Sequence, residues 1–135
     1  MGSKEKTVYL SGAMLGCTDE ECRDWREYAK QNLNCRTLDP MVRDYRERPM
    51  DGMLDMVAGD KADIDACDTL LVNFVKPSVG TSMEVLYAWE RGKSVVLVAP
   101  RDAVISPWLV YHSHHVFHSI DDAVRHINES SLESA

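Results

Sequence analysis

The sequence lacks features that mark several classes of protein. It has no run of about 18 apolar residues and no signal-like amino terminus, so we expect a chain that neither spans a membrane nor is secreted. Its four cysteines show no CxxC spacing, which favours reduced, buried thiols in a cytoplasmic protein over a zinc site. Positive charge is scarce: 15 Lys and Arg against 22 Asp and Glu give a net charge of −7, which disfavours binding of DNA or RNA through the general surface.

Two familiar ligand-binding patterns are also absent or incomplete. The turn that contains Gly12 and Gly16 lacks the GxGxxG pattern of dinucleotide-binding loops, so we interpret it as a turn that lets a small ligand approach the backbone. The segment HSHHVFH, residues 112–118, is rich in histidine but has no acidic partner of the kind that completes a catalytic zinc site. We therefore expect neither a metal ion nor an organic cofactor.

Strand and helix patterns alternate along the 135 residues, without an internal repeat. Strands are expected at residues 7–10, 36–38, 69–75, 94–99 and 116–118, and helices at 19–33, 50–66, 83–91 and 120–128, with a polar loop at 39–49 and a frayed tail at 129–135. This alternation predicts right-handed crossovers and a single α/β domain over residues 1–135. The predicted fold is a Rossmann-like, flavodoxin-like parallel sheet of about five strands with helices on both faces.

The carboxyl ends of the first three strands should meet at one edge of this sheet, where open α/β sheets bind ligands. That edge would gather residues 11–14, Asp39 with Pro40, and residues 78–84 into one cleft. The candidate ligand-binding residues of the cleft are Ser11, Gly12, Ala13, Met14, Asp39, Ser78 and Gly80.

Glu84 follows the most apolar strand pattern of the chain, at residues 69–75. Gly80 gives the intervening turn its backbone freedom, and Ser82 is a suitable N-cap for a buried helix that begins near residue 83. In the first turn of that helix, the helix dipole would keep Glu84 ionised, an effect of roughly 0.3–1 kcal/mol. The residue then either satisfies the dipole alone or serves as a nucleophile for a sugar carbon.

Asp60 interrupts an apolar helical stripe. Met53, Val57, Ile64 and Cys67 fall at i, i+4, i+11 and i+14, and Asp60 takes the i+7 position of the same face. A buried acid either caps or pairs with a structural group, or has its pKa raised by desolvation so that it holds a proton near neutral pH. An acid that carries a proton and an ionised acid at a helix start form the pair that cleaves glycosidic bonds.

Arg43 belongs to a basic cluster, with Arg46 and Arg48, in a loop that also contains acidic residues. Such a cluster is usually a solvated, mixed-charge loop. We name Arg43 as a substrate contact of secondary weight, because a guanidinium suits a phosphate group.

The chain contains four motifs: VYLSGAM (residues 8–14), DKADIDACDTLLVN (60–73), GTSMEVLYAWERGK (80–93) and SPWL (106–109). Together they resemble the nucleoside 2-deoxyribosyltransferases and the related 2′-deoxynucleoside 5′-monophosphate N-glycosidases. The resemblance extends from Val8 to Ile127, and the GTSME block with an upstream acid is its most specific part. It implies that Glu84 is the nucleophile, that Asp60 protonates the departing base, and that Tyr9 holds the nucleophile by hydrogen bonding.

Two positions depart from the transferase and hydrolase patterns in opposite directions. Ser78 aligns with a position that reads the 5′ end of the sugar, which is Asp in well-known bacterial transferases and Ser in the nucleotide hydrolases. A carboxylate there repels a 5′-phosphate, whereas a serine tolerates either a hydroxyl or a phosphate. Leu15 stands where the hydrolases carry an arginine for the phosphate.

The resemblance also implies a homo-oligomer, based on a dimer, in which a late segment of a neighbouring chain completes the active site. Ser106 would then lie near the 5′ end of the sugar, and Trp108 and Tyr111 would line a subunit contact or cover the core.

The sequence thus predicts an enzyme of nucleotide metabolism and nucleobase salvage. It would cleave the N-glycosidic bond of 2′-deoxynucleosides through a covalent deoxyribosyl–Glu84 intermediate and transfer the sugar to another nucleobase or to water. The alternatives are a 2′-deoxynucleoside 5′-monophosphate N-glycosidase and a nucleotide-sensing module without catalysis. Base preference, tolerance of ribose and oligomer size are not indicated by any motif.

Overall fold

A five-stranded parallel sheet forms the centre of the computed structural model, which describes residues 6–44 and 46–133. The strands are β1 (Thr7–Gly12), β2 (Arg36–Leu38), β3 (Thr69–Asn73), β4 (Ser94–Val98) and β5 (His115–Phe117). Their order is β2-β1-β3-β4-β5, and every neighbouring pair is parallel. This is the strand order of flavodoxin-like sheets, so the predicted fold class is confirmed.

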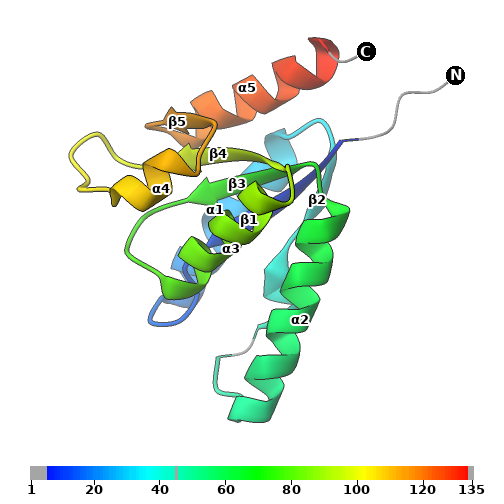
Figure 1. The fold of residues 1–135 in the computed structure, drawn as a ribbon, viewed down its shortest axis with the longest axis vertical. Coiled ribbons are helices and arrows are strands. Elements are labelled where there is room, and N and C mark those ends of the chain that lie inside the picture. Colours follow the sequence, from blue (N-terminus) through cyan, green and yellow to red (C-terminus); the bar gives the residue numbers. More distant parts are fainter. Residues whose placement is uncertain (1–5, 45, 134–135) are drawn as a thin grey trace, which may run out of the picture.

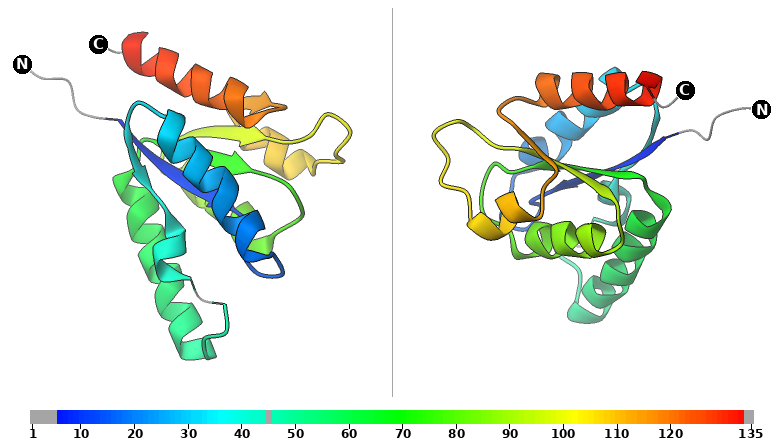
Figure 2. Two further views of the ribbon diagram at one scale, coloured as in Figure 1. Left: turned by 180° about the vertical axis from the view of Figure 1, so that it is seen from behind. Right: turned by 45° about the horizontal axis from the view of Figure 1, so that its top comes forward.

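Helices cover both faces of the sheet (Figures 1 and 2). One face carries α1 (Asp19–Asn32) and α5 (Ile120–Glu133), and the other carries α2 (Met50–Ala66), α3 (Val79–Glu90) and the short α4 (Pro107–Tyr111). A single 3₁₀ turn, η1 (Pro40–Arg43), follows β2. No helix in the described part of the chain is both long and apolar enough to cross a membrane.

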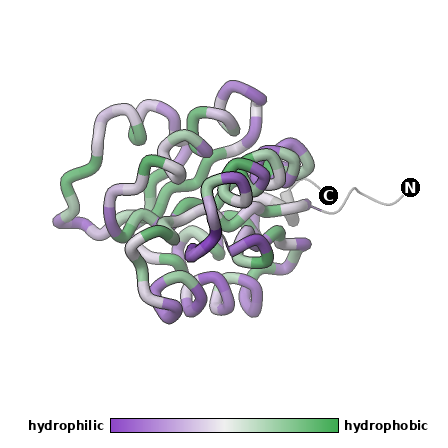
Figure 3. Tube along the Cα trace, turned by 90° about the horizontal axis from the view of Figure 1, so that it is seen from below, coloured by the Kyte–Doolittle hydropathy of each residue, from purple (hydrophilic) through white to green (hydrophobic). Residues whose placement is uncertain are grey.

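The core consists of two apolar clusters, one on each face, because successive strand side chains point to opposite sides. Alternate residues of β1 separate in this way: Val8 and Leu10 pack under α1 and α5, whereas Tyr9 packs under α2 and α3. All five residues of β3 are buried, as expected for a central strand of a parallel sheet. Figure 3 shows hydrophobic segments through the middle of the molecule and hydrophilic ones on the outer turns of the helices.

Helix α3 begins four residues earlier than the sequence predicts. Ser78, not Ser82, is the N-cap, and its side chain accepts a hydrogen bond from the backbone N–H of Thr81 at 3.2 Å. Gly80 is therefore helical rather than part of a turn, and Glu84 lies in the second turn. Both serines can cap a helix, but the cap at Ser78 lets residues 79–82 continue the helix directly from the loop after Pro77. The helix is also less buried than predicted, since Met83 is 66% exposed.

Helix α2 buries a face that is shifted from the predicted stripe. Met56, Asp60 and Ile64 are buried, as predicted for the last two, but Val57 is 49% exposed. The amino-terminal part of α2 extends beyond the sheet (Figure 1), and Val57 lines a cavity rather than the core.

Strand and helix ends differ from the predicted ones by a few residues. Strand β1 continues to Gly12, and β3 ends at Asn73 rather than at residue 75. Helix α5 continues to Glu133, five residues beyond its predicted end at residue 128. The last two residues of the predicted tail lie outside the described residues.

Candidate active site

A cavity of about 530 Å³ lies between α2, α3 and the carboxyl end of β1. Its walls combine three carboxylates, those of Asp60, Glu84 and Glu90, with a largely apolar surface. The lining residues are Gly12, Met14, Pro40, Met50, Met53, Leu54, Met56, Val57, Asp60, Lys61, Ile64, Ser78, Gly80, Thr81, Met83, Glu84, Leu86, Tyr87 and Glu90. All three segments of the predicted cleft therefore contribute to one cavity: residues 11–14, residues 78–84, and the pair Asp39 and Pro40 through Pro40.

Strand β1 holds the carboxylate of Glu84 through two hydroxyl groups. The Tyr9 hydroxyl donates to Oε2 of Glu84 at 2.7 Å, and the Ser11 hydroxyl donates to Oε1, also at 2.7 Å. Tyr9 and Ser11 are two residues apart, so both side chains point to the same face of the strand. The contact expected between Tyr9 and Glu84 is present, whereas Ser11, expected to bind substrate, makes its hydrogen bond to Glu84 instead.

The surroundings of Glu84 act on its ionisation in opposite directions. Burial raises the pKa of Glu84 to about 7, and the charge of Asp60 acts in the same direction, while the hydrogen bonds from Tyr9 and Ser11 lower it. Burial outweighs the effect expected from the helix dipole, which is weaker because Glu84 is not in the first turn. Burial and the charge of Glu84 also raise the pKa of Tyr9, so its hydroxyl stays protonated and able to donate.

Asp60 enters the cavity from α2 and is only 9% exposed. Its Oδ1 accepts hydrogen bonds from Nη2 of Arg43 at 3.0 Å and from Nε of Arg43 at 3.2 Å. Burial raises the pKa of Asp60, as predicted, and the hydrogen bonds and charge of Arg43 oppose that rise. Both predicted environments are thus present, since Asp60 is desolvated and also paired.

Arg43 is bound to carboxylates within the protein rather than free for a substrate. Besides Asp60, its Nη2 contacts Oδ2 of Asp63 at 2.5 Å. The guanidinium contacts two acids of α2, and the substrate contact expected for Arg43 stays a prediction.

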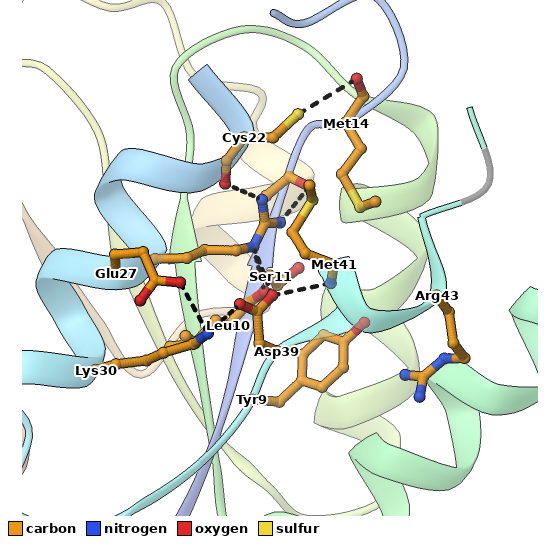
Figure 4. A network of polar contacts seen from close by, with 12 residues as sticks. Tyr9, Leu10, Ser11, Met14, Cys22, Glu27, Lys30, Asp39, Met41 and Arg43 are labelled. Carbon is orange, nitrogen blue, oxygen red and sulfur yellow. Dashed lines mark hydrogen bonds and ion pairs between the residues drawn. The ribbon is translucent and has the colours of Figure 1, made fainter. Parts of the chain in front are cut away.

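Asp39 is likewise engaged within the protein (Figure 4). Its side chain accepts from the backbone N–H of Met41 at 2.8 Å, which caps η1, and forms an ion pair with Lys30 at 2.6 Å. The sequence predicts a substrate contact for Asp39, but its carboxylate instead fixes the start of η1. Ala13 is buried beside the lining residues Gly12 and Met14.

Ser106 is not one of the lining residues of the cavity that contains Glu84. Its side chain caps α4 by accepting from the backbone N–H of Trp108 at 3.2 Å. It lines a second hollow, formed with Met83, Leu86 and His112 among others. A role for Ser106 at the sugar thus requires the neighbouring chain that the sequence resemblance implies.

Sequence reasoning missed Arg26, which is fully buried on α1. Its guanidinium donates to the carbonyl oxygens of Leu10 at 3.2 Å and Gly12 at 3.0 Å, the two residues that flank Ser11. Arg26 thereby fixes the segment of β1 that presents Ser11 to Glu84. The signal was present, because Cys22, Arg26 and Ala29 share one helical face and all three are buried.

Thr81 carries the second missed feature. Its Oγ1 is the buried side-chain atom that has no hydrogen-bond partner in the described part of the chain, and Thr81 lines the cavity. This hydroxyl, close to the amino terminus of α3, is available to form a hydrogen bond with a ligand in the cavity.

Three of the four histidines in residues 112–118 pack against other rings, and Nδ1 of the fourth, His118, lies 3.1 Å from the carbonyl oxygen of Ala99. His112 and His114 pack against the ring of Trp89, with centroid distances of 5.6 and 4.7 Å, and His115 packs against His126 at 4.1 Å. Within residues 6–44 and 46–133, no group of three or more His, Cys, Asp or Glu side chains is placed to hold a metal ion.

Comparisons with known proteins identify relatives by structure and not by sequence. No family model and no curated protein matches the chain. A 2-deoxyribosyltransferase from Bacillus psychrosaccharolyticus is similar in structure, with a TM-score of 0.71 and 18% identity over 87% of this chain and 90% of that one. The CMP N-glycosidase BcmB from Clostridium botulinum is similar with a TM-score of 0.60 and 17% identity, over 93% and 99% of the two chains.

A conserved protein from Enterococcus faecalis V583 is also similar, with a TM-score of 0.76 and 14% identity over 94% of this chain and 99% of that one. At such identities a likeness establishes the fold alone. The chain therefore has the α/β fold that a 2-deoxyribosyltransferase and a CMP N-glycosidase share.

Proposed function

We propose that this protein cleaves the N-glycosidic bond of 2′-deoxynucleosides and transfers the deoxyribose to another nucleobase or to water. The observation that carries the proposal is the arrangement of Glu84. Each of its carboxylate oxygens accepts one hydroxyl hydrogen bond, from Tyr9 and from Ser11, in a cavity that also contains the buried acid Asp60. Such fixed carboxylate pairs are suited to glycosidic cleavage.

In the proposed reaction, the proton of Asp60 passes to a nitrogen of the base as the bond from C1′ to the base breaks. The electron pair of that bond stays with the base. An oxygen of Glu84 forms a bond to C1′, which gives a deoxyribosyl ester of Glu84. The acceptor, a nucleobase or water, then attacks C1′ and gives its proton to Asp60. The bond from C1′ to the Glu84 oxygen breaks and its electron pair returns to Glu84, so both carboxyl groups regain their first state.

The cavity has the size and lining that a nucleoside requires. Its volume of about 530 Å³ falls in the range of roughly 300–1,000 Å³ that small-molecule sites occupy. Met50, Met53, Met56 and Met83 line it, and thioether side chains adapt to flat aromatic ligands of different outline. We place the base against this methionine-rich wall and the sugar between Asp60 and Glu84.

A second candidate is hydrolysis of 2′-deoxynucleoside 5′-monophosphates. It is supported by Ser78 and Thr81, whose hydroxyl groups lie at the amino terminus of α3 in the cavity wall. Helix amino termini favour anions. Leu15 argues against it, because this exposed apolar side chain replaces the arginine of the nucleotide hydrolases. We therefore rank the nucleoside reaction first.

Two incubations distinguish these candidates and the nucleotide-sensing module. The first contains deoxyinosine and adenine, and the second contains each deoxynucleoside monophosphate alone. A transferase forms deoxyadenosine and hypoxanthine in the first. A nucleotide hydrolase releases free base in the second without an acceptor. Binding of ligand without turnover in both would identify a binding module and contradict the proposal.

The matched variants for this assay are Glu84→Gln and Glu20→Gln. The first removes the nucleophile and keeps the size of the side chain, whereas the second alters an exposed glutamate of α1. Loss of turnover in Glu84→Gln alone supports the proposed chemistry. Turnover of Glu84→Gln within about tenfold of wild type rules Glu84 out as nucleophile, since loss of a covalent catalyst costs far more.

A further inference from the structure

The contacts of Arg43 give this residue a place in the proposed reaction, and the inference that follows rests on the proposed function. Arg43 ends η1 and reaches two acids of α2 with one guanidinium. It donates two hydrogen bonds to Oδ1 of Asp60, at 3.0 and 3.2 Å, and one to Oδ2 of Asp63, at 2.5 Å. The catalytic acid of the proposal thus shares its cationic partner with a second carboxylate one helical turn away.

Gly59 makes this approach possible. A Cβ atom on Gly59 would lie 2.7 Å from Cδ and 2.8 Å from Nε of Arg43, closer than packed atoms allow. The arginine side chain therefore crosses α2 directly over the backbone of Gly59 to reach Asp60. The sequence Gly59-Asp60-x-x-Asp63 thus binds one guanidinium through two carboxylates, and Gly59 leaves room for the arginine side chain.

Asp60 and Glu84 also act on each other. Asp60 raises the pKa of Glu84, so ionising one acid makes the other harder to ionise. Such a pair holds one proton over a range of pH. The proposed reaction requires that proton on Asp60, with Glu84 ionised. Tyr9 and Ser11 favour this arrangement because both donate to Glu84, whereas Arg43 opposes it because it favours an ionised Asp60.

The charged groups around Asp60 come from several elements. Arg43 approaches from η1 and lowers the pKa of Asp60, as does the more distant Arg26 of α1; Asp63 of α2 raises it, and Glu84 of α3 is coupled to it. Arg43 is the group that contacts Asp60 directly, and it also contacts Asp63. The position of its guanidinium between these two acids therefore determines how strongly it favours an ionised Asp60.

We propose that Arg43 is a positioning residue that determines which of Asp60 and Glu84 holds their shared proton, with Asp63 drawing part of the guanidinium away from Asp60. Before cleavage, Asp63 shares Arg43, and Asp60 keeps its proton. When that proton passes to the base, Asp60 becomes a carboxylate, and the two hydrogen bonds from Arg43 stabilise the new charge. Arg43 therefore stabilises the ionised Asp60 after proton transfer, and Asp63 favours the protonated Asp60 before it.

The two residues have opposite effects, which a pH profile detects. In Asp63→Asn, the whole guanidinium acts on Asp60, so the alkaline limb of kcat/KM moves down by about one pH unit and the profile narrows. In Arg43→Gln, Asp60 loses its cation, so the alkaline limb moves up by about one unit and the profile broadens. Asp55→Asn, which changes an exposed acid of the same helix, leaves both limbs in place.

A second kinetic readout separates positioning from a structural role. Arg43→Gln lowers kcat at its own pH optimum by about tenfold with KM within about twofold, because the Asp60 carboxylate left after proton transfer has no cation. Shifts of the two variants in the same direction, or no shift in either, overturn the proposal. If Arg43→Gln does not fold, Asp63→Asn and Arg43→Lys provide the same test, since a lysine ammonium lacks the fork that reaches both acids.

The ionisation of Asp60 is also measured without turnover, by carboxyl ¹³C NMR titration of aspartate-labelled protein. Asp63→Asn lowers the titration midpoint of Asp60, and Arg43→Gln raises it. The titration tests the role of Arg43 separately from the proposed function, because it does not depend on turnover. If Glu84→Gln retains activity, the proposed function fails while the titration still tests Arg43. If the midpoint of Asp60 is the same in both variants, the role of Arg43 fails while the proposed function stands.

Discussion

Glu84 combines burial with two hydrogen bonds that favour its charge, and burial has the larger effect on its pKa. A folded-state pKa of about 7 lies above the ordinary value of 4.5, so the folded protein binds more protons than the unfolded chain between these values. The corresponding stability is complete below pH 4.5 and is lost as the pH rises through 7. At pH 8 the ionised Glu84 therefore destabilises the fold.

Glu84→Gln should remove this dependence. The free energy of unfolding of the wild type should fall between pH 5 and pH 8 by ~2–4 kcal/mol more than that of the variant, since one unit of pKa corresponds to about 1.4 kcal/mol. Urea denaturation at the two pH values measures the difference, with Glu20→Gln as the control. Equal pH dependence in wild type and Glu84→Gln would show that Glu84 titrates normally.

Tyr9→Phe is the second prediction at this scale. The variant keeps the ring in the core but removes one of the two donors to Glu84, so the pKa of Glu84 should rise. A hydrogen bond to a charged group contributes roughly 1.5–3 kcal/mol, which corresponds to about one to two pH units. We expect the acidic limb of the kcat/KM profile to move up by that amount. An unchanged acidic limb would mean that the Tyr9 hydroxyl does not act on the nucleophile.

At the scale of elements, one residue at the amino terminus of α3 both caps the helix and is placed to select the substrate. Ser78 caps the helix and lines the cavity, and aspartate is an equally good N-cap. Ser78→Asp should therefore keep the stability of the helix while adding a negative charge where a 5′-phosphate would lie. We expect nucleoside transfer to stay measurable and any activity on monophosphates to disappear.

The wild type should use free deoxynucleosides at least as well as their monophosphates. A preference for monophosphates of tenfold or more, about 1.4 kcal/mol, with release of free base in the absence of an acceptor, would replace the transferase proposal by the hydrolase. Comparison of kcat/KM for deoxynucleosides and their monophosphates decides this point.

The elements also show how far sequence patterns reach. The helix and strand periodicities predict the five strands and the buried position of Asp60, because both follow from which side chains avoid water. They misplace the start of α3, since Ser78 and Ser82 both satisfy the chemistry of an N-cap. They also miss the contact between Arg43 and Asp60, which depends on how the aperiodic loop after β2 folds back over Gly59.

At the scale of the whole molecule, one side of the chain presents apolar side chains to solvent. The exposed large residues there include Met50, Leu54, Met83, Trp108 and Tyr111, which lie on α2, α3 and α4. Trp108 is 73% exposed next to Ser106. Exposed apolar side chains of this kind are typical of an interface, and the homo-oligomer that the resemblance implies would cover some of them.

A mixing experiment tests whether a neighbouring chain completes the site. Ser106→Ala and Glu84→Gln should each have low activity alone. A hybrid dimer contains one site with an intact Glu84 from the first variant and an intact Ser106 from the second. Mixing and refolding the two should therefore restore activity above the sum of the separate variants. Activity equal to that sum would place Ser106 outside the neighbouring site.

The most direct test of the central claim is mass spectrometry of the protein quenched in acid during turnover of a deoxynucleoside. We predict a mass increase equal to one deoxyribosyl group, located on the peptide that contains Glu84, in the wild type and in the Glu20→Gln control. The increase should be absent from Glu84→Gln. A deoxyribosyl adduct on another residue, or turnover of Glu84→Gln at the wild-type rate, would contradict the assignment of Glu84 as the nucleophile.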